Sequence, residues 1–274
     1  MNLWRVREAV GRVRGPAGRV VFGRPCAADR PLAGFDHGDY AELLARFVGA
    51  DGLVAYADWR RDAAAVRALD DYLLRLGRAD VAAPTGRADR LAFWVNAYNA
   101  AVLAGVLHDY PAGCGCRRRG WVGFDRFRDV RLWAGGTCRS LDRIEHATVR
   151  PLGEPLTHFA LVCGARGCPP LRAYTAAGFG PEVAANARRF LARPDAFRAD
   201  PGARTVRLTR LLKWYGRDFA RTPAGVLEAL RPYLPDDADL RWLGSGPVRQ
   251  CYFNYDWTLN DLYYNCYIDV QGVL

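Results

Sequence analysis

The spacing of apolar residues predicts a chain built mainly of helices. After Asp39, which suits a helix N-cap, the residues Leu43, Leu44, Phe47 and Val48 fall on one helical face. The same periodicity, bounded by capping residues, glycine or proline, predicts further helices over 58–78, 87–110, 141–150, 181–193, 209–220 and 223–233. Of these, 87–110 is the longest and is apolar on most sides, which favours a position inside the molecule.

Shorter runs predict strands over 124–133, 158–163, 205–208 and 248–255. The run 158–163 (HFALVC) is almost unbroken in its apolar character and ends at a turn with two glycines, Gly164 and Gly167. Cys168 follows, and the prolines after it predict that it lies at a helix N-cap. Two thiols, Cys163 and Cys168, are therefore expected where a strand gives way to a loop, a common place for ligands in sheet proteins.

These elements together predict an α+β fold, a helix-rich single domain around a small mixed β-sheet that carries 158–163. Papain-like and transglutaminase-like folds are the expected architectural relatives, by analogy alone. Residues 1–33 are rich in arginine, glycine and proline and are expected to form a basic, mostly flexible arm, with order beginning near Phe35. Residues 34–274 are expected to form the single domain.

Charge and composition change this picture little. The net charge of +10 suggests nucleic acid, but Lys213 is the only lysine among 39 basic residues, a bias typical of genome composition. The arginines form no dense block interleaved with stacking aromatics, so nucleic-acid binding is not expected. No apolar run approaches the roughly 18 residues of a membrane span, and the N-terminus has no apolar secretory core. We expect a cytoplasmic protein without a transmembrane segment, whose eight cysteines are reduced thiols.

The thiols and histidines offer the clearest candidate chemistry. A cysteine nucleophile needs a base to form its thiolate and a group that orients the base. Cys163 is the preferred nucleophile and Cys168 the second choice, since a helix N-terminus would lower the pKa of Cys168. His146 is the expected base, because its helix precedes 158–163 by a short loop and can fold back over it. On a regular strand His158 faces away from Cys163, and Glu145 acts on His146 only indirectly.

Two amides on the long helix can be interpreted in two ways. Asn96 and Asn99 are three residues apart, so they share a helical face and are expected inside the molecule. Buried amides need hydrogen-bond partners. They either tie the helix to a neighbouring backbone, or one of them orients the catalytic His146 in a Cys–His–Asn set.

Five sequence motifs together resemble one family. They are LAFWVNAYNA at 91–100, SLDRIEHATVR at 140–150, HFALVCGARGCPPLR at 158–172, LLKWYGRDF at 211–219 and YDWTLN at 255–260. In this order they are similar to the domain of unknown function 547 family, DUF547, over about 35–260. The resemblance implies no established substrate or catalytic residue. It does imply that some relatives are exported and that others are joined to thiol-active domains such as glutaredoxin.

The resulting hypothesis is a cysteine-dependent hydrolase or an acyl or amide transferase acting on an unknown peptide or small molecule. The backbone amides of Gly164–Gly167 are expected to receive the oxyanion. No cofactor or metal is expected. The expected substrate-binding residues are Arg166, His158, Trp94, Tyr98 and Asp256.

Three alternatives stay open beside the hydrolase. The first is dithiol redox chemistry between Cys163 and Cys168, although their spacing is Cys-x4-Cys and not the thioredoxin Cys-x2-Cys. The second is a zinc site at Cys114 and Cys116 with Cys138 or His108. The third is a peptide-binding or protein-binding module without catalysis.

Overall fold

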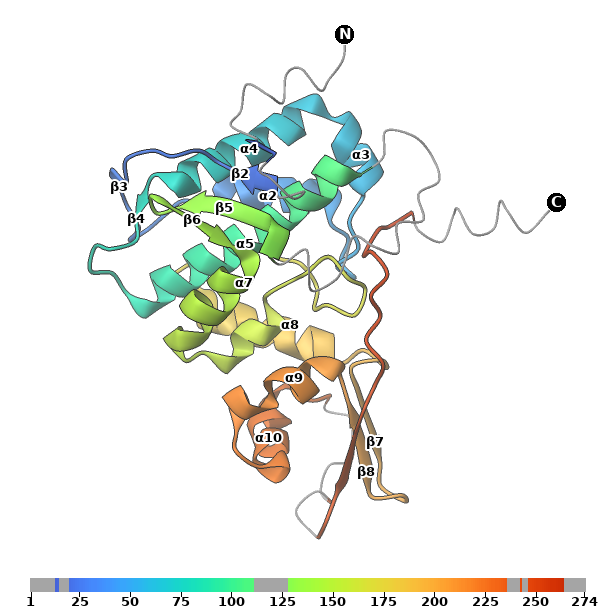
Figure 1. The fold of residues 1–274 in the computed structure, drawn as a ribbon. Coiled ribbons are helices and arrows are strands. Elements are labelled where there is room, and N and C mark those ends of the chain that lie inside the picture. Colours follow the sequence, from blue (N-terminus) through green and yellow to red (C-terminus); the bar gives the residue numbers. More distant parts are fainter. Residues whose placement is uncertain (1–12, 15–19, 111–127, 236–241, 243–245, 264–274) are drawn as a thin grey trace, which may run out of the picture.

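The computed structural model describes residues 13–14, 20–110, 128–235, 242 and 246–263. In this range helices dominate and the strands form three small sheets, one of four strands, one of two and one of three, with parallel and antiparallel pairs (Figure 1). The predicted α+β class and the helix-rich single domain are thereby confirmed. The analogy to papain-like and transglutaminase-like folds stays a prediction.

Helix α5 (Arg87–Asp109) is the centre of the core, as its apolar character predicts, with every residue from Leu91 to His108 buried. Helices α3 (Tyr56–Arg61) and α4 (Ala63–Gly77) pack against it, and α2 (Gly38–Phe47) packs against those two helices. The predicted helix 58–78 is divided in two because the Asp62 carboxylate caps α4, accepting hydrogen bonds from the Ala64 and Ala65 amides. Within the described residues, α5 alone is long and apolar enough to cross a membrane, and that stretch is wholly buried inside the fold.

The first sheet includes part of the predicted arm. Its order is β1 (Val13–Arg14), β2 (Val20–Phe22), β5 (Val130–Ala134) and β6 (Thr137–Ser140), and β2 runs parallel to β5. Val20 and Phe22 are buried, so order begins before Phe35, and that expectation is wrong. A three-residue strand between glycines gives too short an apolar run to be recognised by periodicity. A two-stranded sheet, β3 (Arg30–Pro31) and β4 (Ala79–Asp80), follows. The partition at residue 33 stays a prediction.

The second half begins with a helix of changing pitch. It comprises α7 (Leu141–Ile144), a π-helical turn (Glu145–Val149) and a 3-10 turn (Arg150–Leu152). A further 3-10 turn (Pro155–Phe159) leads into an irregular buried segment that ends at α8 (Phe179–Leu191). The third sheet consists of β7 (Phe197–Asp200), β8 (Thr205–Leu208) and β9 (Arg249–Tyr252), accompanied by α9 (Arg210–Phe219), α10 (Pro223–Leu230) and the 3-10 turn Arg231–Tyr233.

The segment after β9 connects the two ends of the molecule. From the third sheet it runs back toward α3, as Figure 1 shows in red. On the way Leu259 forms a bridge with Ala165, and Asp261 forms one with Val54. The amides of Arg166 and Gly167 donate to the carbonyls of Thr258 and Asp256. This tail therefore holds the turn that carries the two thiols.

Candidate functional site

The apolar run 158–163 is buried, but it is not a strand. His158 and Phe159 end the 3-10 turn that Pro155 begins, and residues 160–163 have no strand partner among the described residues. The side chain of Asn99 takes the place of a neighbouring strand. Its Nδ2 donates to the Ala160 carbonyl at 2.9 Å and its Oδ1 accepts from the Val162 amide at 2.9 Å. The predicted central strand is therefore wrong, because side chains on helices satisfy the backbone of this segment.

Two other buried side-chain amides, those of Asn96 and Asn186, also form hydrogen bonds with backbone groups. Asn96 donates to the Tyr174 carbonyl at 2.7 Å and accepts from the Tyr174 amide at 3.0 Å. Asn186 on α8 donates to the carbonyls of Phe159 and Pro170. None of these bonds reaches a histidine, so Asn96 and Asn99 tie α5 to neighbouring backbone and do not orient His146. This is the first of the two interpretations that the sequence allowed.

The irregular segment brings the two candidate thiols into contact. The Sγ atoms of Cys163 and Cys168 lie 3.1 Å apart, and the Tyr255 hydroxyl lies 3.4 Å from the first and 3.0 Å from the second. The Cys163 amide also donates to the Cys168 sulfur at 3.1 Å. Cys168 is 4% exposed, whereas Cys163 is half-buried. The pair is thus one unit with a buried and a more accessible sulfur.

Hydrogen bonding separates the two thiols in acidity. Burial alone would raise the pKa of Cys168, but the Cys163 thiol, the Tyr255 hydroxyl and the backbone amides of Cys163 and Ala165 lower it to about 7. The pKa of Cys163 is raised because this thiol is hydrogen-bonded to Cys168 and is buried beside it. The first proton lost by the pair therefore leaves its charge on Cys168.

The turn between the thiols is held from two sides. The Arg193 guanidinium at the end of α8 donates to the carbonyls of Cys168 and Arg166, at 2.9 and 3.0 Å. The tail accepts the amides of Arg166 and Gly167 from the other side. These two amides are therefore occupied and do not form the expected oxyanion hole. Cys168 itself lies outside any helix, so its acidity comes from local donors and not from a helix N-terminus.

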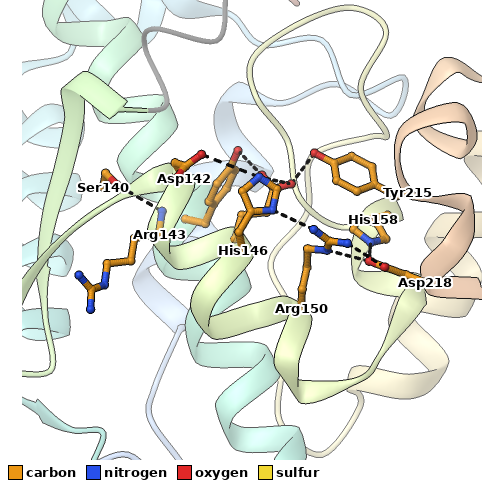
Figure 2. Close-up of polar contacts among 10 residues, drawn as sticks. Ser140, Asp142, Arg143, His146, Arg150, His158, Tyr215 and Asp218 are labelled. Carbon is orange, nitrogen blue, oxygen red and sulfur yellow. Dashed lines mark hydrogen bonds and ion pairs between the residues drawn. The ribbon is translucent and has the colours of Figure 1, made fainter.

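The expected base lies apart from the thiols. His146 has a side chain that is 41% exposed, and its closest polar neighbour is the Arg150 guanidinium, 3.2 Å from Nδ1 (Figure 2). Among the described residues neither Cys163 nor Cys168 forms a hydrogen bond with any histidine. Because the helix becomes a π-turn at Glu145, His146 points outward and does not fold back over the thiols.

Glu145 is the buried polar residue of that turn. Its carboxylate accepts from the Tyr215 hydroxyl at 2.6 Å and from the Tyr98 hydroxyl at 3.3 Å (Figure 2). Burial raises the pKa of Tyr98, and the charges of Glu145 and Cys163 raise it further. The pKa of Tyr215 is raised by the same causes. Both phenols therefore lie close enough to Glu145 and to Cys163 for each charge to act on them.

A second network holds α9 in place. His158 stacks on the Tyr215 ring with centroids 4.1 Å apart, and its Nε2 lies 2.7 Å from the Asp218 carboxylate. The Arg150 guanidinium donates two hydrogen bonds of 2.8 Å to the same carboxylate (Figure 2). Hydrogen bonding to Arg150, aided by that to His158, lowers the pKa of Asp218 to about 2 despite partial burial. Burial dominates at His158 and lowers its pKa.

The expected substrate-binding residues do not gather at one place. Trp94 is buried with the Arg139 guanidinium over its ring, and Arg166 donates to the Asp261 carbonyl. Asp256 closes a turn by accepting from the amide and the hydroxyl of Thr258. Only His158 and Tyr98 contribute side chains to the networks described above, whereas Arg166 and Asp256 contribute backbone groups to the turn between the thiols.

Sequence reasoning missed the tyrosines and the carboxylate that complete the site, Tyr255, Tyr215 and Asp218. Each lies in a motif that resembles the DUF547 family, YDWTLN or LLKWYGRDF. The polar residues inside these aromatic motifs were the available indication. Cys114 and Cys116, proposed as zinc ligands, lie outside the described residues. Within the described residues no group of three or more His, Cys, Asp or Glu side chains gathers to hold a metal ion.

Comparison with known proteins gives one match. The family model described as "Protein of unknown function, DUF547" matches residues 83–191, a range that contains α5 and ends with α8. The match is shorter than the expected 35–260. It contains both thiols and Glu145, but not Tyr215, Asp218 or Tyr255. No curated protein and no solved structure matches the chain.

Proposed function

Because residues 83–191 belong to the DUF547 family, whose function is unknown, we propose a function from the chemistry of the site: thiol–disulfide exchange by Cys163 and Cys168. The observation that carries this proposal is the 3.1 Å separation of the two sulfur atoms. A disulfide bond is about 2.05 Å long, so the sulfurs need to approach by only about 1 Å. Cys168 is the more acidic thiol and Cys163 the more exposed residue. The attacking sulfur must be both a thiolate and accessible, so the proton of Cys163 has to pass to Cys168 across their contact.

The reaction proceeds in two displacements. Cys168 ionises first and then takes the proton of Cys163 across the 3.1 Å contact. The Cys163 thiolate formed in this way attacks one sulfur of an external disulfide R–S–S–R and expels one thiolate. Cys168 then loses its proton and attacks Cys163, which breaks the mixed disulfide and expels the second thiolate. The dithiol is oxidised, the external disulfide is reduced, and the two released thiolates take up two protons. The Tyr255 hydroxyl donates to whichever sulfur carries the charge.

The expected hydrolase draws less support from the same geometry. Acyl transfer by cysteine uses a neighbouring base, and among the described residues no imidazole contacts either sulfur. His146 as base stays a prediction, as does the enzyme class itself. Cytoplasmic localisation also stays a prediction, although reduced thiols would be the resting state there.

Peptide mapping after controlled oxidation tests the proposal. Trypsin cuts after Arg166, between the two cysteines, so only a disulfide can join peptide 144–166 to peptide 167–172. We expect this linked pair in oxidising glutathione buffers, with loss after dithiothreitol and in Cys163→Ser or Cys168→Ser. Cys138→Ser, a half-buried cysteine on β6, is the matched control that should leave the linkage intact. If the peptides stay unlinked in buffers as oxidising as about −180 mV, the proposal is wrong.

A further inference from the structure

A neighbour of Tyr255, the tyrosine that contacts both thiols, is the most exposed aromatic residue of the described chain. Trp214 on α9 is 38% exposed, and the other large hydrophobic with comparable exposure is the aliphatic Leu262. Large aromatic side chains are common at the centres of interfaces, because they bury much area at small entropic cost. The position of Trp214 relative to the thiols therefore matters.

Trp214 forms part of an aromatic cluster that includes Tyr255, the residue in contact with the thiol pair. Its ring centroid lies 5.0 Å from that of Tyr255 and 5.8 Å from that of Trp257, and Tyr255 and Trp257 are 4.6 Å apart. The Tyr255 hydroxyl in turn contacts both sulfurs. A partner that stacks on Trp214 would lie next to the ring that touches Cys163.

The same helix surrounds this tryptophan with positive charge. Arg210 and Arg217 stand four residues before and three residues after Trp214, so they flank it on one helical face, and Lys213 is adjacent in sequence. Within the described residues none of these three cations forms an ion pair or side-chain hydrogen bond with a carboxylate. The one acid of the helix, Asp218, is already bound by Arg150 and His158.

We propose that Trp214, Arg210, Lys213 and Arg217 form the docking surface for the protein partner whose disulfide Cys163 attacks, and that this partner presents an acidic segment with an aromatic or aliphatic side chain. Charge complementarity selects acidic residues, and the exposed indole selects an apolar side chain beside the disulfide. The role as a redox partner rests on the proposed function; the binding of an acidic segment does not.

Fluorescence anisotropy with the reduced protein tests the surface independently of any redox step. The probes are two fluorescein-labelled peptides of equal length with one phenylalanine each, one rich in Asp and Glu and one in which Lys replaces every acid. The acidic peptide should bind at least about tenfold more tightly, and its affinity should fall with added salt. Trp214→Ala and Arg217→Glu should each weaken it about tenfold, Trp214→Ala because truncation of an interface tryptophan has effects of that size.

Arg67→Glu makes the same charge change at an exposed site on α4 and is the control. Figure 1 shows that α4 lies at the opposite end of the molecule from α9. Equal binding of both peptides overturns the inference, as does unchanged affinity in both Trp214→Ala and Arg217→Glu. A separate failure of peptides 144–166 and 167–172 to become linked by small oxidants would remove the proposed redox function while leaving this binding result to be judged by itself.

Discussion

The cause of the lowered pKa of Cys168 can be tested by removing one oxygen atom, the hydroxyl of Tyr255. The Tyr255 hydroxyl lies 3.0 Å from the Cys168 sulfur, and the pKa of Cys168 is lowered from an ordinary value of 9.0 to about 7. At pH 7 such a thiol is about half ionised, whereas one at its ordinary value is about 1% ionised. Tyr255→Phe keeps the ring in the aromatic cluster and removes only the donor. It therefore isolates one of the hydrogen bonds that stabilise the thiolate.

The size of the effect follows from the strength of that bond. A hydrogen bond to a charged group is worth about 1.5–3 kcal/mol, and one pKa unit corresponds to about 1.4 kcal/mol. Loss of the Tyr255 hydroxyl should therefore raise the pKa of Cys168 by about 1–2 units. The thiolate fraction at pH 7 should fall from about a half to between about 10% and 1%.

Thiolate absorbance at 240 nm measures this shift. The titration of Cys168 is the difference between the wild-type curve and that of Cys168→Ser, and the same difference is taken in the Tyr255→Phe background. Tyr252→Phe, on β9, should leave the midpoint in place because no hydrogen bond of its hydroxyl reaches the thiols. A midpoint unmoved by Tyr255→Phe in a folded protein would refute the account of the acidity given above.

Three further changes test the scaffold. Asn99→Leu should lower the free energy of unfolding by about 2–6 kcal/mol in urea titrations, because two buried backbone groups lose their partners. Asp218→Asn should destabilise the protein above the ordinary carboxyl pKa of 3.8, and this loss should vanish as the pH falls through about 2, the value to which hydrogen bonding to Arg150 lowers the folded-state pKa. Gly167→Ala should cost about 1–3 kcal/mol in thermal or urea unfolding, since an added Cβ would lie 2.9 Å from the Tyr255 ring.

Two of these changes have a matched comparison variant. Asn254→Leu alters an exposed amide and should change stability by no more than about 0.5 kcal/mol. Gly180→Ala, where nothing lies within 4 Å of the new Cβ, should be neutral or stabilising. Equal losses in Asn99→Leu and Asn254→Leu, or in the two glycine variants, would contradict the packing described. So would a deficit in Asp218→Asn that persists at pH 2.

Helices and strands that are specified by their own apolar pattern and capping residues could be predicted from the sequence. Helix α5 was expected over 87–110 and β8 over 205–208, and both form within a residue of those bounds, because the apolar pattern and the local caps agree. The run 158–163 could not be predicted, because its backbone is satisfied by Asn99 and Asn186 from distant helices. An apolar run of six residues has the same appearance whether its partners are strands or side chains.

The sequence predicted that the two cysteines lie together, but it did not predict which side chains surround them. Cys163 and Cys168 were expected together, and the five-residue separation keeps them close in any compact turn. Tyr255 is 87 residues beyond Cys168, and its contact depends on the path of the tail back across the turn. His146 was assigned by α-helical geometry, which the π-turn at Glu145 changes.

That π-turn acts as a spacer of fixed length. In a regular α-helix, residues five apart point about 140° away from each other. Here the Arg150 amide donates to the Glu145 carbonyl, and both side chains reach one phenol: the carboxylate contacts the Tyr215 hydroxyl at 2.6 Å, and the guanidinium lies 5.5 Å from the ring centroid. Replacing the exposed Ala147 should consequently leave stability unchanged. Deleting it would rotate Arg150 by about 100°, so that Glu145 and Arg150 could no longer both contact Tyr215. What natural variation must preserve in this turn is therefore the number of residues, more than their identity.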